Sequence, residues 1–156
     1  MKWFATLMFF LFASLVYADG GGLSAASNPL WKDECGSCHI AYPPQLLSAE
    51  NWQKLMGGLD KHFGANASMD AMDAKEVLVF LQRNAGENER YSAPSLRISD
   101  TRWFRREHSE ISRHTWSNPA IKSPSNCTAC HVKAGQGDWS ERGIKIPGGK
   151  KKKIDD

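Results

Sequence analysis

The chain has 156 residues and a formal net charge of +3, and 41% of its residues are hydrophobic. This length suits one ordinary domain or two very small ones. The weak positive charge gives no compositional support for nucleic-acid binding.

Residues 1–18 have the pattern of a secretory signal peptide. Lys2 precedes an apolar run, and Val16 and Ala18 are the small residues of a cleavage site. The run is shorter than the roughly 20 residues that a membrane-spanning helix requires, and no other segment is long and apolar enough. We therefore predict cleavage after Ala18, export of the mature chain, and no membrane span after cleavage.

A short helix is predicted directly before the first cysteine. Asn28 is a suitable N-cap, and Pro29 fits the first helical position. The helix leads into CGSCH at 35–39, and the same pattern returns as CTACH at 127–131.

The repeated CxxCH pattern is the strongest signal in the chain, and it uses all 4 cysteines. Two thiols with this spacing reach one porphyrin edge, and the imidazole that follows reaches the iron. A thioredoxin-like dithiol requires a βαβ context, which the sequence lacks, and zinc ribbons use CxxC pairs that are much closer together. We therefore predict two covalently bound haem c groups, with thioethers from Cys35, Cys38, Cys127 and Cys130 and with His39 and His131 as proximal iron ligands.

Two helices are predicted between the first motif and residue 86. One runs from a cap at Ser48 to Gly64, and the other from a cap at Ser68 or Asp70 to Gly86. The proline-bearing loop at 40–47 is expected to turn a backbone carbonyl toward the imidazole of the first motif.

The sixth ligand of the first iron is expected between the first motif and the closing helix. His62 lies three residues after Leu59, on the buried side of its predicted helix, and is the preferred ligand. The competitors are Met56, Met69 and Met72.

The second iron has no methionine in its half of the chain and no histidine after its motif. Its sixth ligand must therefore come from upstream or be absent. A helix predicted to begin near residue 100 carries His108 on one face with Phe104 and Ile111, so His108 is preferred. His114, a turn later, is the alternative.

Large aromatic side chains are expected to pack on the haems: Trp31, Trp52, Trp103, Phe104, Trp116 and Trp139. Arg102, Arg105 and Arg106 form a basic cluster beside the proposed ligand helix. They neutralise haem propionates, face a partner, or form a solvated helix face.

The predicted fold is mainly α. Residues 19–86 follow the element order of a small class I-like cytochrome c domain, and 87–98 form a connector. An irregular, helix-poor second haem-binding region follows at 99–147, and 148–156 form a basic flexible tail.

The chain resembles the bacterial dihaem cytochrome c family in ECGSCHIAYPPQLL with LMGGLDKHFG, in RISDTRWFRREH, and in SPSNCTACHVKAGQGDW. The resemblance covers residues 30–147. It implies a periplasmic protein with two bis-histidine haems of low potential, with His62 at the family's HFG position and His108 at its RREH position. It also implies two redox partners: an oxygen-binding monohaem cytochrome c as acceptor and a membrane b-type cytochrome, linked to quinol, as donor.

The predicted function is electron transfer, not catalysis, because an iron with two histidine ligands has no open position for a substrate. The alternative is a haem enzyme or gas sensor in which one iron lacks its sixth ligand and binds oxygen, nitric oxide, nitrite or peroxide. A third hypothesis is a non-haem metal or redox protein that uses the CxxC pairs.

Overall fold

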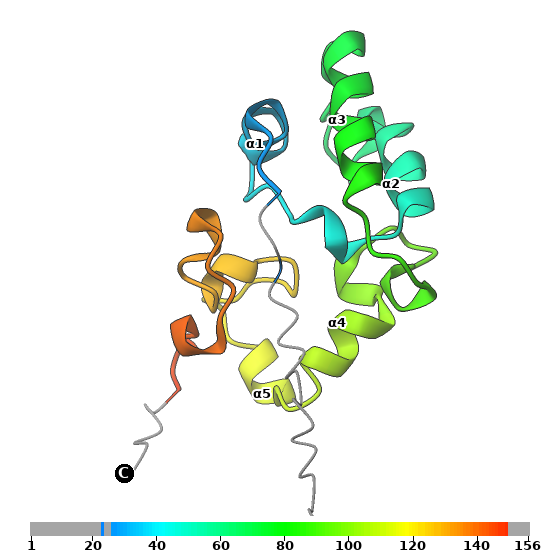
Figure 1. Ribbon diagram of the computed structural model, residues 1–156. Coiled ribbons are helices and arrows are strands. Elements are labelled where there is room, and N and C mark those ends of the chain that lie inside the picture. The colour runs from blue at the N-terminus through cyan, green and yellow to red at the C-terminus, as the bar shows by residue number, and fades with distance from the viewer. Residues whose placement is uncertain (1–22, 24–25, 150–156) are drawn as a thin grey trace, which may run out of the picture.

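The computed structural model describes residues 23 and 26–149 of the chain (Figure 1). The predicted signal peptide, and the lysine-rich end from residue 150, lie outside the described residues. The α-helices are α1 Pro29–Gly36, α2 Ala49–Met56, α3 Ala71–Arg83, α4 Arg102–Glu107 and α5 Arg113–Trp116. Short 3-10 helices join them: η1 Pro44–Leu46, η2 Leu59–Lys61, η3 Glu89–Tyr91, η4 Ile98–Asp100, η5 Cys127–Ala129, η6 Ala134–Gln136 and η7 Glu141–Gly143.

In this part of the chain, β structure is limited to isolated bridges, so the predicted mainly α fold class is confirmed. None of the helices in residues 26–149 has the length and apolar character needed to cross a membrane.

The predicted first helix is α1. The side chain of Asn28 accepts a hydrogen bond from the backbone N–H of Trp31 at 2.9 Å, and Pro29 occupies the first turn. The cap therefore fixes where α1 begins, and the first CxxCH motif starts within its last turn.

The second helix, α2, is shorter than predicted. Ser48 caps it by accepting from the N–H of Asn51 at 3.3 Å, but α2 ends at Met56 and not at Gly64. The glycines at 57 and 58 follow at once, and glycine is a poor helix former. The chain continues through η2 into a turn in which Phe63 and Gly64 have φ values of +50° and +100°.

The third helix, α3, begins directly after one of its two predicted caps. Asp70, and not Ser68, is the cap, since its carboxylate accepts from the N–H of Met72 at 2.8 Å. The helix ends at Arg83, before the predicted stop at Gly86.

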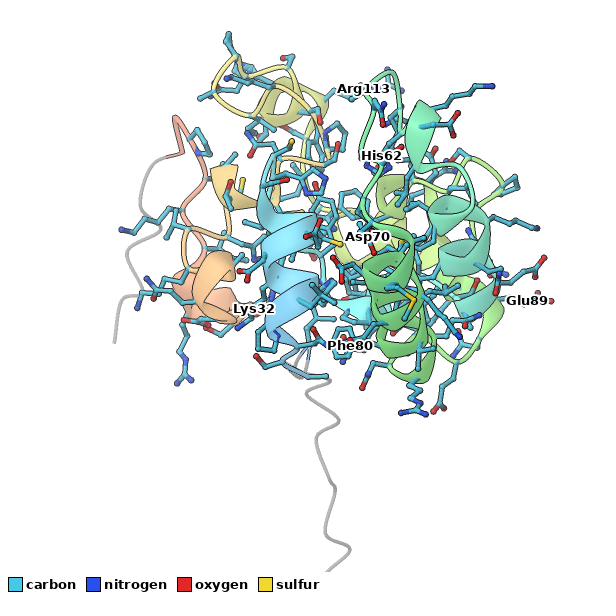
Figure 2. The ribbon with its side chains drawn as sticks, turned by 90° about the horizontal axis from the view of Figure 1, so that it is seen from above. Lys32, His62, Asp70, Phe80, Glu89 and Arg113 are labelled. Carbon is cyan, nitrogen blue, oxygen red and sulfur yellow. The ribbon has the colours of Figure 1, made fainter. Side chains whose placement is uncertain are left out.

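The three longer helices share one hydrophobic core. Helix α3, which carries the labelled Phe80 in Figure 2, packs against both α2 and α1. The centre of the Phe80 ring lies 5.2 Å from that of Trp31 in α1. The buried residues of this core are Trp31, Leu47, Trp52, Val77 and Leu81. Val77 and Leu81 are fully buried, and their spacing of four residues places them on one face of α3.

The second half of the chain has little regular structure. Helix α4 is capped by the Thr101 hydroxyl, which accepts from the N–H of Phe104 at 3.1 Å, and ends at Glu107. His108 and Ile111 therefore lie beyond the helix that was predicted to hold them. After α5 only 3-10 turns occur in the described residues, and this segment lies below and beside α1–α3 in Figure 1.

Candidate functional site

The first CxxCH motif begins inside α1 and ends just after it. Cys35 belongs to α1, whereas Cys38 and His39 follow it. Nδ1 of His39 lies 2.8 Å from the carbonyl oxygen of Ile40. The tautomer that donates this hydrogen bond leaves Nε2 free to bind a metal. The predicted carbonyl partner of His39 is thereby confirmed, and it precedes the prolines of the loop.

His62, labelled in Figure 2, directly follows η2, and it lines the same cavity as His39. The centres of the two rings are 6.2 Å apart, and their planes differ by 29°. An imidazole nitrogen binds a metal at about 2.0 Å and lies about 1.1 Å from its ring centre, so two rings on opposite sides of one metal have centres about 6 Å apart. The rings are thus spaced to bind one metal between them. A loop, and not the predicted helix face, positions His62.

Both rings line a cavity of about 370 Å³, which we call cavity 1. Its wall also contains both cysteines of the first motif and the indoles of Trp31 and Trp52. Met56 and Met69 line it as well, whereas Met72 does not and is 74% exposed.

Burial sets the protonation of the groups around cavity 1. Burial, and then the charge of Glu34, raises the pKa of the Cys35 thiol to about 11. Burial, and then the charges of His39 and Arg97, lowers the pKa of His62. The environment therefore favours the neutral imidazole, which is the form that binds metals.

The second motif faces a histidine in the same way. Cys127 begins η5, and Cys130 and His131 follow. The rings of His108 and His131 have centres 6.2 Å apart, and their planes differ by 71°. Nδ1 of His108 lies 2.9 Å from the carbonyl oxygen of Phe104, whose ring stacks on the imidazole with centres 4.0 Å apart.

These two rings line a second cavity of about 800 Å³, which we call cavity 2. The aromatic residues of its wall are Trp103, Phe104, Trp116 and Trp139, so each aromatic residue named from the sequence lines one of the two cavities. His114 is exposed on α5 and does not line cavity 2. The fold therefore brings His108 to the second motif and leaves His114 outside.

Burial acts on the second motif as on the first. It raises the pKa of the Cys127 thiol to about 11. Burial, and then the charge of His108, lowers the pKa of His131. Nδ1 of His131 is buried without a hydrogen-bond partner among the described residues, which is uncommon for such an atom.

The residues of each cavity fit a covalently bound haem. Each cavity combines two cysteines and a histidine of one motif with a second histidine at metal-spanning distance, in a wall rich in aromatic and aliphatic side chains. Within residues 26–149, no group of three or more His, Cys, Asp or Glu side chains could hold a bare metal ion. The two CxxC pairs therefore do not converge on one zinc site.

The two cavities meet at the second motif, because Cys127 lines both. Tyr42 stacks on His39 with ring centres 4.6 Å apart, and its hydroxyl donates to the carbonyl oxygen of Ser125 at 2.6 Å. Burial, and then the nearby Cys127, raises the pKa of Tyr42 to about 12. No spacing rule relates residue 42 to residue 125, so the sequence does not predict this contact.

The predicted arginine cluster lines neither cavity. Arg105 lies 3.5 Å from Asp100, and Arg106 lies 2.8 Å from Glu107. The arginines that line the cavities are Arg97 in cavity 1 and Arg142 in cavity 2. No local pattern marks these two, since their position depends on how the chain folds back.

Comparison with known proteins gives a consistent result. The family model of dihaem cytochrome c matches residues 31–139, which include both CxxCH motifs. No curated protein matches the chain. A diheme cytochrome type c from Shewanella baltica OS155 is 36% identical with a TM-score of 0.68, over 78% of this chain and 94% of that one. DHC purified from Rhodobacter sphaeroides is 38% identical with a TM-score of 0.64, over 72% of this chain and 97% of that one.

The family match and the structural matches agree with the helical fold and with the two cavities. They support covalent haem attachment as the role of the CxxC pairs, and not a zinc site or a redox dithiol. The chain therefore belongs to the dihaem cytochrome c family and binds two haem c groups, which implies a role in electron transfer.

Proposed function

We propose that the protein is a periplasmic electron carrier in which two histidines bind each haem iron. The pairs are His39 with His62 in cavity 1 and His131 with His108 in cavity 2. The observation that carries the proposal is the ring separation of 6.2 Å in both pairs. Two imidazoles at this spacing would hold one iron between them and would leave it no position for a substrate.

The bound haems supply reversible one-electron exchange at iron. The thioether cysteines anchor them, and the carbonyls of Ile40 and Phe104 orient His39 and His108 by accepting from Nδ1. Burial keeps His62 and His131 in the neutral form that binds a metal.

Buried aromatic side chains form part of the wall of each cavity. Trp31 and Trp52 are each 6% exposed, and Phe104 is 7% exposed. Paired histidine ligands favour low reduction potentials, because replacing histidine by methionine raises the potential.

We propose a membrane b-type cytochrome, linked to quinol, as the donor and an oxygen-binding monohaem cytochrome c as the acceptor. Family membership and the export pattern of residues 1–18 support this assignment. We also propose a division of the chain into a haem 1 unit at 19–86, a connector at 87–98 and a haem 2 region at 99–147.

The test is the absorption spectrum of the mature dihaem protein, reduced with dithionite, before and after carbon monoxide is added. We expect a low-spin spectrum that carbon monoxide does not change, since both irons have two strong ligands. A Soret shift with the amplitude of one haem would contradict the proposal, and would favour the haem enzyme or gas sensor.

Histidine variants identify the ligands. His62→Ala and His108→Ala should each make one haem high-spin and reactive with carbon monoxide, whereas both haems of His114→Ala should stay low-spin. His114 is a matched control, because it lies close to His108 in sequence but outside cavity 2. A high-spin haem in His114→Ala, with none in His108→Ala, would reverse the assignment.

A further inference from the structure

Cavity 1 has a sparse set of charged side chains. Besides its histidines and cysteines, its wall contains one arginine, Arg97, and one glutamate, Glu34, and no lysine. Arg97 comes from the segment 96–99, which lines the cavity although it follows α3 by many residues. The connector therefore contributes a fixed positive charge to the first haem site.

An aromatic ring holds the guanidinium of Arg97 in place. Its central carbon lies 4.2 Å from the centre of the Phe63 ring, which is a cation–π distance. The Phe63 ring meets the His62 ring edge-on, with centres 4.9 Å apart. The charge of Arg97 is thus one ring away from a proposed iron ligand, and it contributes to the lowered pKa of His62.

Unlike two arginines of α4, Arg97 has no acidic partner among the described residues. Arg105 and Arg106 pair with Asp100 and Glu107, but Arg97 forms no ion pair with any residue in the described part of the chain. Its donors are therefore available to a carboxylate inside cavity 1. Haem carries two carboxylates, its propionates, at one edge of the porphyrin.

We propose that Arg97 binds a propionate of the haem in cavity 1 and raises the reduction potential of that haem. A guanidinium presents paired N–H donors that match a carboxylate. Its positive charge disfavours the ferric state relative to the ferrous state, because the ferric iron carries one more positive charge. The inference depends on haem in cavity 1, which family membership supports, and not on the identity of the sixth ligand.

The expected effect is modest. Arg97 is exposed, so that solvent and salt weaken its charge. Exposed ion pairs change equilibria by about 1.4- to fivefold, and we expect a change of this size in the ratio of reduced to oxidised iron at a fixed potential.

The test is a spectroelectrochemical titration of the dihaem protein and of three variants. Arg97→Gln should lower one of the two midpoint potentials and leave the other unchanged. Arg97→Lys retains the charge and should restore most of the shift. Arg90→Gln is the matched control, since Arg90 also lies over an aromatic ring, Tyr91, but lines neither cavity, and both potentials should stay at the wild-type values.

Salt provides a second measurement. The shift of Arg97→Gln should shrink as ionic strength rises from about 0.01 M to about 1 M, because the screening length falls from about 30 Å to about 3 Å. Two unchanged potentials in Arg97→Gln would overturn the proposal, and so would an equal shift in Arg97→Lys. The absorption spectrum of each variant separates this from an error in the proposed histidine ligands, which would produce high-spin haem and not a shifted low-spin potential. If Arg97→Gln fails to bind both haems, Arg97→Met is titrated in its place, because it also removes the charge and should lower the same midpoint potential.

Discussion

Backbone carbonyls determine which ring nitrogen of two histidines is free to bind a metal. Ile40 and Phe104 accept from Nδ1 of His39 and His108 through main-chain oxygens. Because a main-chain acceptor survives most substitutions, the ring orientation depends on the local backbone and not on one neighbouring side chain. His131 differs, since its buried Nδ1 has no such partner among the described residues. We therefore expect the second site to tolerate changes near its motif less well.

The stability of the protein should depend on pH through its buried histidines. Burial lowers the pKa of both His62 and His131 from the value of about 6.5 for a free histidine. Below about pH 6.5 the unfolded chain then binds more protons than the folded chain, and iron ligation of the same rings acts in the same direction. Stability should be highest above about pH 6.5 and fall on acidification.

Thermal unfolding of the dihaem protein between about pH 8 and about pH 5 measures this dependence. The midpoint should fall with pH in the wild type and, to the same extent, in His114→Gln, because His114 lines neither cavity. A midpoint that rises on acidification would show that these histidines do not govern the dependence.

At the scale of the elements, N-caps could be predicted and helix ends could not. Asn28 and Ser48 were assigned as caps from their residue type, and Asp70 was one of two choices. The cap of α4 was missed, because several neighbouring residues are equally suited to that position and only the fold selects Thr101. The helix expected to carry His62 stops early, yet His62 still reaches cavity 1, because the following turn replaces the helix as its support.

Gly86 has a structural role that differs from the predicted one. It was assigned as a helix stop, but α3 ends earlier, and Gly86 instead lies against the η1 and η3 turns. A Cβ atom at this position would overlap Cγ of Tyr91 and would lie 2.6 Å from the carbonyl oxygen of Gln45. The absence of a side chain lets the backbone of α3's exit approach these turns.

Gly86→Ala should therefore destabilise the protein. We expect a loss of about 1–3 kcal/mol in the free energy of unfolding, which is the usual cost of overpacking. Gly135→Ala is the control, because a Cβ there meets no atom within 4 Å, and its change should stay below about 0.5 kcal/mol. Urea titration measures the free energy of unfolding of both variants. An equal value for Gly86→Ala and Gly135→Ala would show that the turns move aside freely.

At the scale of the whole molecule, residues from both halves of the chain build cavity 1. The motifs alone predict two haems and their cysteines, since that information is local. The contributions of Tyr42, Arg97 and Cys127 to the same wall depend on the path of the connector, which has no periodic pattern. The overall fold class was predictable for the opposite reason, because α1–α3 each carry their own caps and apolar faces.

The Tyr42 hydrogen bond should stabilise the attachment of the two halves. Tyr42→Phe removes the O–H that donates to Ser125 and should lower the free energy of unfolding by about 1 kcal/mol. Tyr91→Phe is the control, since the Tyr91 hydroxyl accepts only a local bond, from its neighbour Arg90 at 3.0 Å. Chemical denaturation should show a larger loss for Tyr42→Phe, and an equal loss in both variants would mean that this contact does not hold the halves together.

The position of Cys127 in the wall of cavity 1 also affects when that cavity can be completed during synthesis of the chain. The first motif is synthesised well before the second, and at roughly 5–20 residues per second the chain takes roughly 5–18 s to extend from one to the other. Throughout that interval the first pocket lacks Ser125 and Cys127, and for its earlier part it also lacks Leu96 to Ser99, so that one side of its wall is incomplete. The first site therefore cannot be completed before the second motif has been made, and the nascent first pocket stays accessible until then.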